Sequence, residues 1–118
     1  MDGFNAIYFN IANVLIECAS KKQLISYSEL CNRIGYGNYR KIGSYIDLVT
    51  KFTYEKYGVF ISTIVVLKGT NKPSSGFMPM YRERTNDTKH KDSKIIKSQQ
   101  EKVFNEDWSN LINLMKQN

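Results

Sequence analysis

Two helix-start signals separated by a glycine turn, in the stretch "SYSELCNRIGYGNYRKIGSYI" (residues 26–46), constrain the fold of this chain more than any other feature. Ser26 and Glu29 form a capping-box pattern, in which the hydroxyl and the carboxylate each accept a hydrogen bond from an otherwise unpaired backbone N–H group. This pattern predicts a helix from about Tyr27 to Ile34. The following "GYGN" predicts a short turn, because glycine tolerates the positive φ angles of a tight corner between helices.

A longer helix is predicted from Tyr39 to about Tyr57, with Asn38 as its cap and Gly58 at its end. At 100° per residue its apolar positions share one face, which consists of Ile42, Tyr45, Ile46, Val49 and Thr53. The opposite face carries a polar stripe, which consists of Arg40, Ser44, Asp47 and Lys51. This helix therefore has an apolar back and a short front that carries two cations.

The segments around this pair complete a recognisable element order. Apolar residues from Gly3 to Ser20 recur at intervals of three and four, which predicts an amphipathic first helix. The run "VFISTIVVLKG" (59–69) is rich in β-branched residues and predicts a strand. After the turn "GTNKPSSG" (69–76), "FMPMY" (77–81) is interpreted as a returning strand, confined to an edge by its proline. Three helices followed by a β-hairpin wing are the elements of an α+β winged helix-turn-helix.

One folded unit is expected, because 118 residues fall within the usual size of a single domain. Residues 1–81 form the predicted winged-helix domain. Residues 82–94 form a predicted basic polar linker or loop, since "RERTNDTKHKDSK" contains no apolar residue. Apolar periodicity returns within residues 95–118, which predicts an additional C-terminal helix that docks on the domain.

The charge of the chain favours polyanions as partners, because seventeen cations and eleven carboxylates give a net charge of +6. In a winged helix, the second helix of the turn unit enters the major groove of DNA and the wing reaches the backbone. The predicted DNA contacts are therefore Tyr27, Tyr39, Arg40, Lys41, Ser44 and Lys51 on the helices and Lys68 and Lys72 on the wing. Arginine suits bidentate contact with guanine, whereas lysine mainly neutralises phosphate.

A simpler interpretation of the same residues is a solvated helix face. Asp47 precedes Lys51 by four positions and would pair with it, which contributes little stability at a surface. A carboxylate at this position also opposes phosphate binding. Tyr27, Tyr36 and Tyr39 are as consistent with packing in the core or the turn as with contact to DNA.

Residues that carry catalytic or metal chemistry are sparse. Cys18 and Cys31 occupy apolar helical positions and are interpreted as reduced core thiols. The single histidine, His90, lies in a polar run, so no four-ligand zinc site is expected. The sequence offers no glycine-rich phosphate loop and no nucleophile with an adjacent base. We therefore predict a protein that is not an enzyme and that needs neither a metal nor a cofactor.

The segment "ISYSELCNRIGYGNYRKIGSYI" resembles the winged helix-turn-helix of alkylguanine DNA alkyltransferases and alkyltransferase-like proteins. The matching positions are Ser26, Tyr27, Leu30, Ile34, Gly35, Arg40, Ile42 and Gly43. The resemblance implies a place for Tyr27 beside a phosphate near the target nucleotide, and for Arg40 where the family's arginine enters the duplex during base flipping. The family's Pro-Cys-His-Arg motif is absent, since "FISTIVVLKG" follows instead, so the resemblance does not extend to alkyl transfer. The chain also resembles small uncharacterised bacterial winged-helix proteins, some associated with mobile elements, which implies no known activity.

Two functional hypotheses follow from the sequence. The first is a non-enzymatic winged-helix protein that binds DNA through the helix starting near Tyr39 and through a basic wing. The alternative is a protein-interaction module of a mobile element or phage, which engages a host, replication or defence protein. It predicts an exposed apolar patch and a basic helix covered by the terminal helix. The sequence shows neither a signal peptide nor a membrane-length apolar run, so a cytoplasmic location is expected, while the oligomeric state stays open.

Overall fold

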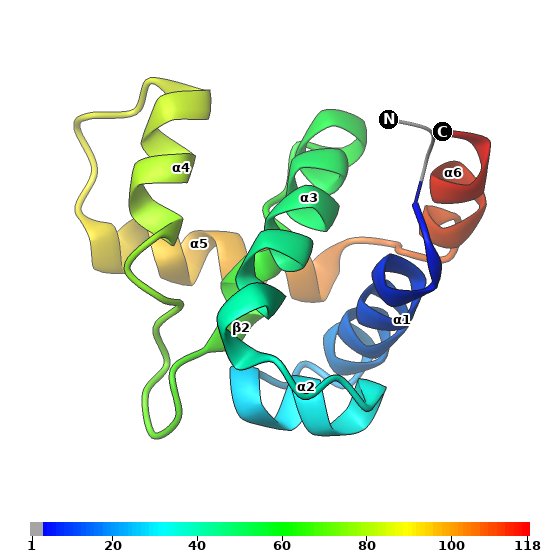
Figure 1. Ribbon diagram of the computed structural model, residues 1–118. Coiled ribbons are helices and arrows are strands. Elements are labelled where there is room, and N and C mark those ends of the chain that lie inside the picture. Colours follow the sequence, from blue (N-terminus) through cyan, green and yellow to red (C-terminus); the bar gives the residue numbers. More distant parts are fainter. Residues whose placement is uncertain (1–3) are drawn as a thin grey trace.

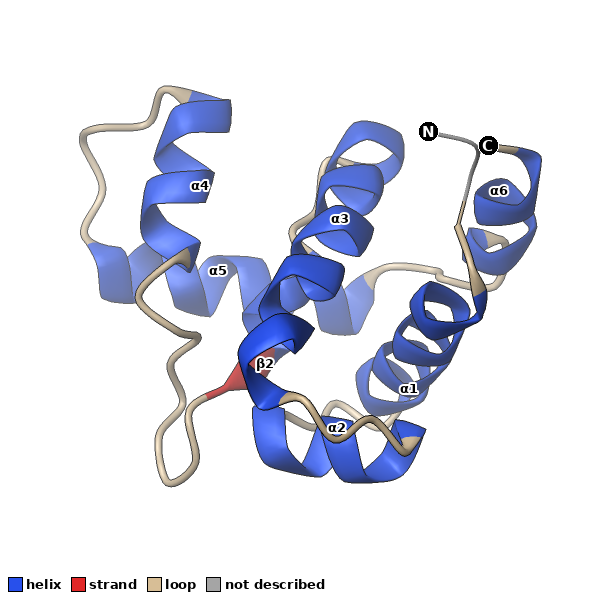
Figure 2. Ribbon diagram, viewed as in Figure 1, coloured by secondary structure: helices blue, strands red, loops and turns tan. Residues whose placement is uncertain are grey.

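A computed structural model describes residues 4–118 and consists mainly of helices (Figures 1 and 2). The α-helices are α1 (Ala6–Ser20), α2 (Tyr27–Ile34), α3 (Tyr39–Tyr57), α4 (Phe77–Thr85), α5 (Asp92–Asn105) and α6 (Leu111–Gln117). A 3-10 helix, η1 (Ile61–Ile64), and two short strands, β1 (Ile25–Ser26) and β2 (Val65–Val66), complete the elements. In Figure 1, α1 and α6 lie to one side of α3, whereas α4 and the start of α5 lie to the other.

The helix pair α2–α3 has the bounds and caps that the sequence predicts. The Ser26 hydroxyl accepts a hydrogen bond from the Glu29 N–H group at 3.1 Å, and α2 ends at Gly35 with a φ of 70°. The Asn38 side chain accepts from the N–H groups of Arg40 and Lys41, which satisfies two unpaired donors in the first turn of α3. The predicted helix bounds and the caps by Ser26, Asn38 and Gly35 are confirmed, and the Asn38 cap fixes where the polar stripe of α3 begins. The reciprocal bond to the Glu29 carboxylate that a capping box predicts is not formed in the described structure.

The main core lies where α1, α2 and α3 meet the segment that follows α3. α1 begins at Ala6 and packs against α2, α3 and α6. Its fully buried side chains include Ile11 and Leu15, which meet the apolar back of α3. Residues 1–3, where the predicted first helix starts, lie outside the described residues.

The α+β winged-helix prediction is wrong, because residues 4–118 contain no β-hairpin. The only sheet in this part of the chain joins β1 and β2 in parallel, with Ile25 beside Val65 and Ser26 beside Val66. The segment predicted as a returning strand, 77–81, instead begins the helix α4. The fold is therefore a helical assembly with one minimal parallel ladder.

The first half of the predicted hairpin forms a strand only at Val65–Val66, and the residues before it, 59–64, are buried among helices. All residues from 59 to 66 are buried, and η1 packs against α1, α3 and α5. Backbone groups of this buried segment therefore pair with side chains from the surrounding helices. Gln99 of α5 accepts from the Phe60 N–H group at 3.1 Å, and Thr53 of α3 donates to the Val59 carbonyl at 2.8 Å. A short β-branched run is equally compatible with such a buried connection.

The second half of the predicted hairpin is helical because its proline occupies the third residue of α4. The first turn of a helix has unpaired N–H groups, so the missing donor of Pro79 costs no hydrogen bond there. Phe77 and Tyr81, four positions apart on α4, both contact the ring of Phe60, with ring centroids 5.9 and 5.1 Å away. These rings and Ile95 of α5 form a second apolar cluster, which holds α4 in place.

The C-terminal region contains two helices where the sequence predicts one. The predicted polar segment 82–94 includes the last turn of α4, a loop at 86–91 and the start of α5. α5 ends at Asn105, and the Trp108 indole N–H group donates to the Val103 carbonyl at 2.8 Å across the following turn. Leu111 and Met115 of α6 are buried in the main core, where α6 packs against α1.

Candidate nucleic-acid interface

The first turns of α3 carry most of the predicted contact residues, and they are exposed. Tyr39 is 53% exposed, and the side chains of Arg40 and Lys41 follow it at the start of the helix. Ser44 is exposed one turn later, where its hydroxyl donates to the Lys41 carbonyl at 2.8 Å. Lys51 is exposed on the same stripe, about 16 Å from Arg40 along the helix axis by the rise of an α-helix.

The loop after β2 carries the other two predicted cations, although it is not a wing. The Leu67 N–H group donates to the Lys72 carbonyl at 2.9 Å, which closes residues 67–72 into a compact turn. The Thr70 hydroxyl accepts from the Lys72 N–H group at 3.1 Å inside this turn. Lys68 and Lys72 are both exposed on it.

The predicted contact residue Tyr27 connects this loop to the helix pair. Its hydroxyl accepts a hydrogen bond from the Ser74 N–H group at 3.2 Å, and its side chain is half-buried. A small cavity of about 70 Å³ lies beside this bond, and Gly43 and Asp47 of α3 line it together with Tyr27 and Ser74. The start of α2, the polar stripe of α3 and the loop after β2 therefore adjoin one another. Tyr27 has mainly a packing role in this arrangement.

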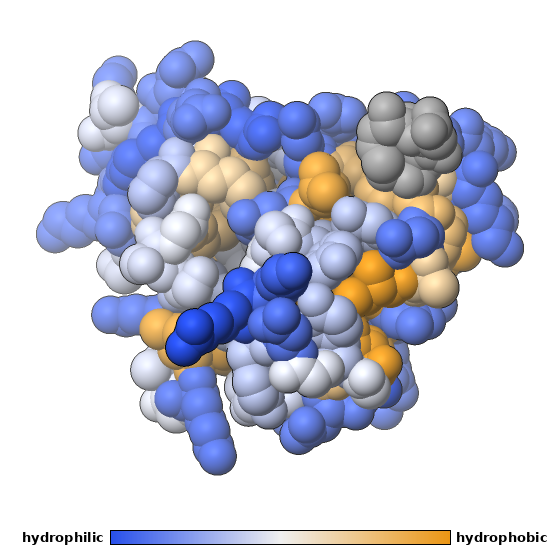
Figure 3. Space-filling model, viewed as in Figure 1, coloured by the Kyte–Doolittle hydropathy of each residue, from blue (hydrophilic) through white to orange (hydrophobic). Residues whose placement is uncertain are grey.

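Five exposed cations on these adjoining segments form what we call the basic face: Arg40, Lys41, Lys51, Lys68 and Lys72. Within residues 4–118, ion pairs join Lys21 and Arg33 to Glu17, Arg82 to Asp92, and His90 to Asp87. No ion pair involves the basic face within this part of the chain. Figure 3 shows strongly hydrophilic side chains over the first turns of α3 and the neighbouring loop. The positive charges of this face are therefore available to an external anion.

Asp47 is the one acidic residue of the α3 stripe. Its carboxylate does not pair with Lys51 in the described structure. The residue as a whole is exposed, but its carboxyl group borders the small cavity, and desolvation there raises its pKa above the ordinary value. Its negative charge is thus disfavoured relative to that of a fully solvated carboxylate.

Residues 4–118 contain no group of three or more histidine, cysteine, aspartate or glutamate side chains placed to hold a metal ion. Cys18 and Cys31 are buried and free, as predicted, and burial raises the pKa of both thiols. Over the same range, no helix has the length and apolar character needed to cross a membrane.

Two residues that shape this region were missed from the sequence. Ser74 supplies the backbone donor that meets Tyr27, and Gln100 donates to the carbonyls of Thr63 and Asn71 at 2.9 and 3.0 Å. Gln100 thereby ties the loop after β2 to α5. Neither residue belongs to a periodic pattern, and only the adjacent polar pair Gln99–Gln100 within a helical stretch hints at buried amide contacts.

Comparison of the chain with protein-family models, with curated proteins and with solved structures found no match.

Proposed function

We propose that this protein binds duplex DNA without catalysing a reaction, and that the basic face supplies the contacts. The observation that carries the proposal is the gathering of five exposed cations, without ion pairs in the described structure, on α3 and the adjoining loop. Lysine and arginine side chains that neutralise phosphates release condensed counterions, which provides the affinity. Contacts of this kind position a protein on DNA with little sequence information.

Arg40 is the residue of this face best suited to contact a base. It lies in the first turn of α3, and its guanidinium can donate two parallel hydrogen bonds to the O6 and N7 atoms of guanine. Tyr39 and Ser44 flank it and provide hydroxyl groups for phosphate or base contacts. In this proposal, Lys41, Lys51, Lys68 and Lys72 contact the backbone.

The position of the C-terminal helix supports this proposal over the protein-interaction alternative. That alternative predicts that the terminal helix covers the basic face. Instead, α6 packs against α1, and the polar stripe of α3 is exposed. The alternative also predicts an exposed apolar patch, and the large exposed apolar side chains in the described structure are Tyr39, Leu48 and Leu67.

Fluorescence anisotropy with a labelled DNA duplex, measured over a series of salt concentrations, tests the proposal. If the four lysines contact phosphates, the slope of log K against log salt should be about −3.6, at about −0.9 per contact. The double variant Arg40→Gln/Lys41→Gln should bind more weakly at low salt, because the base contact is lost, and should reduce the size of the slope by about 0.9, because one phosphate contact is lost. The matched control is Lys116→Gln, which removes an exposed cation from α6 and should leave both values unchanged.

Two results would contradict the proposal. One is the absence of micromolar binding at low salt. The other is a double variant that retains the affinity and the salt slope of the unmodified protein, because binding would then not use the start of α3. Circular dichroism of each variant should show an unchanged helical signal, since the substituted side chains are exposed.

A further inference from the structure

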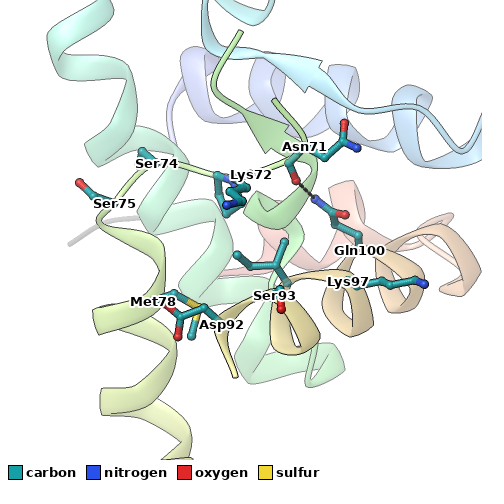
Figure 4. A pocket seen from close by; sticks show the side chains of 11 residues that line it. Asn71, Lys72, Ser74, Ser75, Met78, Asp92, Ser93, Lys97 and Gln100 are labelled. Carbon is teal, nitrogen blue, oxygen red and sulfur yellow. Dashed lines mark hydrogen bonds between the residues drawn. The ribbon is translucent and has the colours of Figure 1, made fainter. Parts of the chain in front are cut away.

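A groove separate from the small cavity lies between the loop after β2 and α5 (Figure 4). Its volume is about 650 Å³, within the range of about 300–1,000 Å³ that is usual for ligand sites. Residues 71–75 form one wall, and residues of α5 between Asp92 and Gln100 form the other. Met78 of α4 closes one end between them.

The walls of this groove are fixed by hydrogen bonds at several points. The side-chain amide of Gln100 donates to the Asn71 carbonyl of the loop and to the Thr63 carbonyl of η1. On the far side of the loop, the Ser74 N–H group donates to Tyr27. The groove is therefore already formed in the free protein, so a ligand would not need to order the loop in order to bind.

The lining combines apolar side chains with unpaired positive charge. Pro73, Met78 and Ile96 provide the apolar surface. Lys72 stands on the loop wall and Lys97 on the helix wall, and neither forms an ion pair in the described structure. The single carboxylate of the lining, Asp92, is paired with Arg82 at 2.7 Å. The groove thus favours a ligand that has both anionic groups and an apolar part.

The polar atoms of the lining distinguish among ligands of this description. Ser74, Ser75 and Ser93, each with a hydroxyl group, are among the residues that line the groove. An alkyl chain would cover these hydroxyls without offering hydrogen bonds, whereas a peptide backbone offers both donors and acceptors. Single-stranded nucleic acid is bound mainly by stacking of bases on aromatic rings, and no aromatic side chain lines the groove.

We propose that this groove binds an acidic peptide segment of a partner protein. One aliphatic side chain of the peptide contacts Met78 and Ile96, while its carboxylates lie against Lys72 and Lys97. Lys72 belongs both to this groove and to the basic face, whereas Arg40, Lys41 and Lys51 lie outside the groove and Lys97 and Ile96 lie outside the basic face, so these residues distinguish peptide binding from DNA binding.

Selection of peptides from a random library displayed on phage, with the full chain as target, tests this inference. Selection should enrich sequences in which acidic residues flank an aliphatic residue. Synthetic versions of these peptides should bind at least about tenfold more weakly to Lys97→Glu and to Ile96→Ser, which corresponds to about 1.4 kcal/mol. The matched control is Lys51→Gln, which removes an exposed lysine outside the groove and should change the affinity less than twofold.

Nuclear magnetic resonance then shows whether the peptide occupies the groove. Amide shifts on titration should concentrate in residues 71–75 and 92–100. The inference is overturned if no peptides are enriched, if the enriched peptides are basic or uncharged, or if their affinity survives both groove variants. It is also overturned if decanoate or oligo-dT shifts these amides and the selected peptides do not. DNA binding by Lys97→Glu, measured separately, keeps a failure of this inference distinct from a failure of the proposed function.

Discussion

At the residue scale, two buried threonines on α3 show how the same side chain can have opposite effects on stability. Thr50 and Thr53 are both fully buried. The Thr53 hydroxyl donates to the Val59 carbonyl at 2.8 Å and lies 3.4 Å from the Ile61 N–H group, from which it accepts. The Thr50 hydroxyl has no hydrogen-bond partner among residues 4–118. Thr53 therefore joins α3 to the buried segment, whereas Thr50 contributes mainly its methyl group.

Substitution of each threonine by valine, which has nearly the same shape, separates these roles. Thr53→Val should lower the free energy of unfolding by about 1–3 kcal/mol, because it leaves buried backbone groups without their partners. Thr50→Val should leave stability unchanged or raise it, because it removes an unpaired buried hydroxyl. Urea unfolding followed by circular dichroism measures both changes. Equal losses in the two variants would show that the bonds of Thr53 contribute nothing.

Individual residues also show which part of the basic face could be predicted from the sequence. The exposure of Arg40, Lys41, Ser44 and Lys51 follows from a period of 3.6 residues, and the structure has all four exposed. The position of Tyr27 does not follow from local pattern, because its partner Ser74 is 47 residues away. The groove between the loop after β2 and α5 does not follow from local pattern either, since its walls come from separate segments without periodic patterns.

At the scale of elements, the first three helices were predictable because local signals determine them. Capping residues, the glycines at 35 and 58 and amphipathic periodicity together define α1, α2 and α3. Residues 59–66 and 77–85 were not, because tertiary contacts override their local preferences. In the first segment only Val65 and Val66 pair as a strand, while the residues before them bond to side chains. The second segment forms a helix against the Phe60 ring despite Pro79.

The loop between α4 and α5 is an element held largely by one carboxylate. Asp87 accepts hydrogen bonds from the N–H groups of Lys89 and His90 and contacts the His90 ring Nδ1 atom at 2.9 Å. These bonds, led by that with the His90 side chain, lower the pKa of Asp87 to about 2 from an ordinary 3.8. Arg82 adds bonds to the carbonyls of Asp87 and His90.

This lowered pKa makes the contribution of Asp87 dependent on pH. Because the folded protein favours the ionised carboxyl group, the stabilisation is complete well above 3.8 and is lost as pH falls from 3.8 towards 2. The free energy of unfolding of the unmodified protein should exceed that of Asp87→Asn at about pH 5, and the difference should shrink as pH falls below about 4. Urea unfolding at a series of pH values measures it. A difference that does not vary with pH would contradict this assignment.

At the scale of the whole molecule, the buried segment 59–66 joins the α1–α3 core to α5. α3 binds it from one side through Thr53, and α5 binds it from the other through Gln99 and Gln100. Gln99 is only 5% exposed, and its side-chain oxygen is the acceptor for the Phe60 N–H group. The stability of the α1–α3 core is therefore linked to the docking of α5.

Replacing Gln99 with leucine should destabilise the entire fold rather than α5 alone. We expect a loss of about 1–3 kcal/mol in the free energy of unfolding, because the Phe60 N–H group remains buried without an acceptor. The control is Ser98→Ala, an exposed neighbour on the same helix, which should change stability by less than about 0.5 kcal/mol. Hydrogen exchange should report faster exchange in α1 and α3 as well as in α5. Faster exchange confined to α5 would show that the stability of the α1–α3 core is not coupled to the docking of α5.

The hydrogen bond between Gln99 and the Phe60 N–H group also determines when this chain can complete its fold during synthesis. Another 42 residues must be added after Tyr57, the last residue of α3, before Gln99 exists to receive the Phe60 N–H group. At about 5–20 residues per second, that interval lasts about 2–8 s. Residues 59–66 are made early in that interval, and they lack their partners on α5 until it ends. The last step of folding therefore has to follow the synthesis of α5, even though the signals that define α1, α2 and α3 are complete long before it.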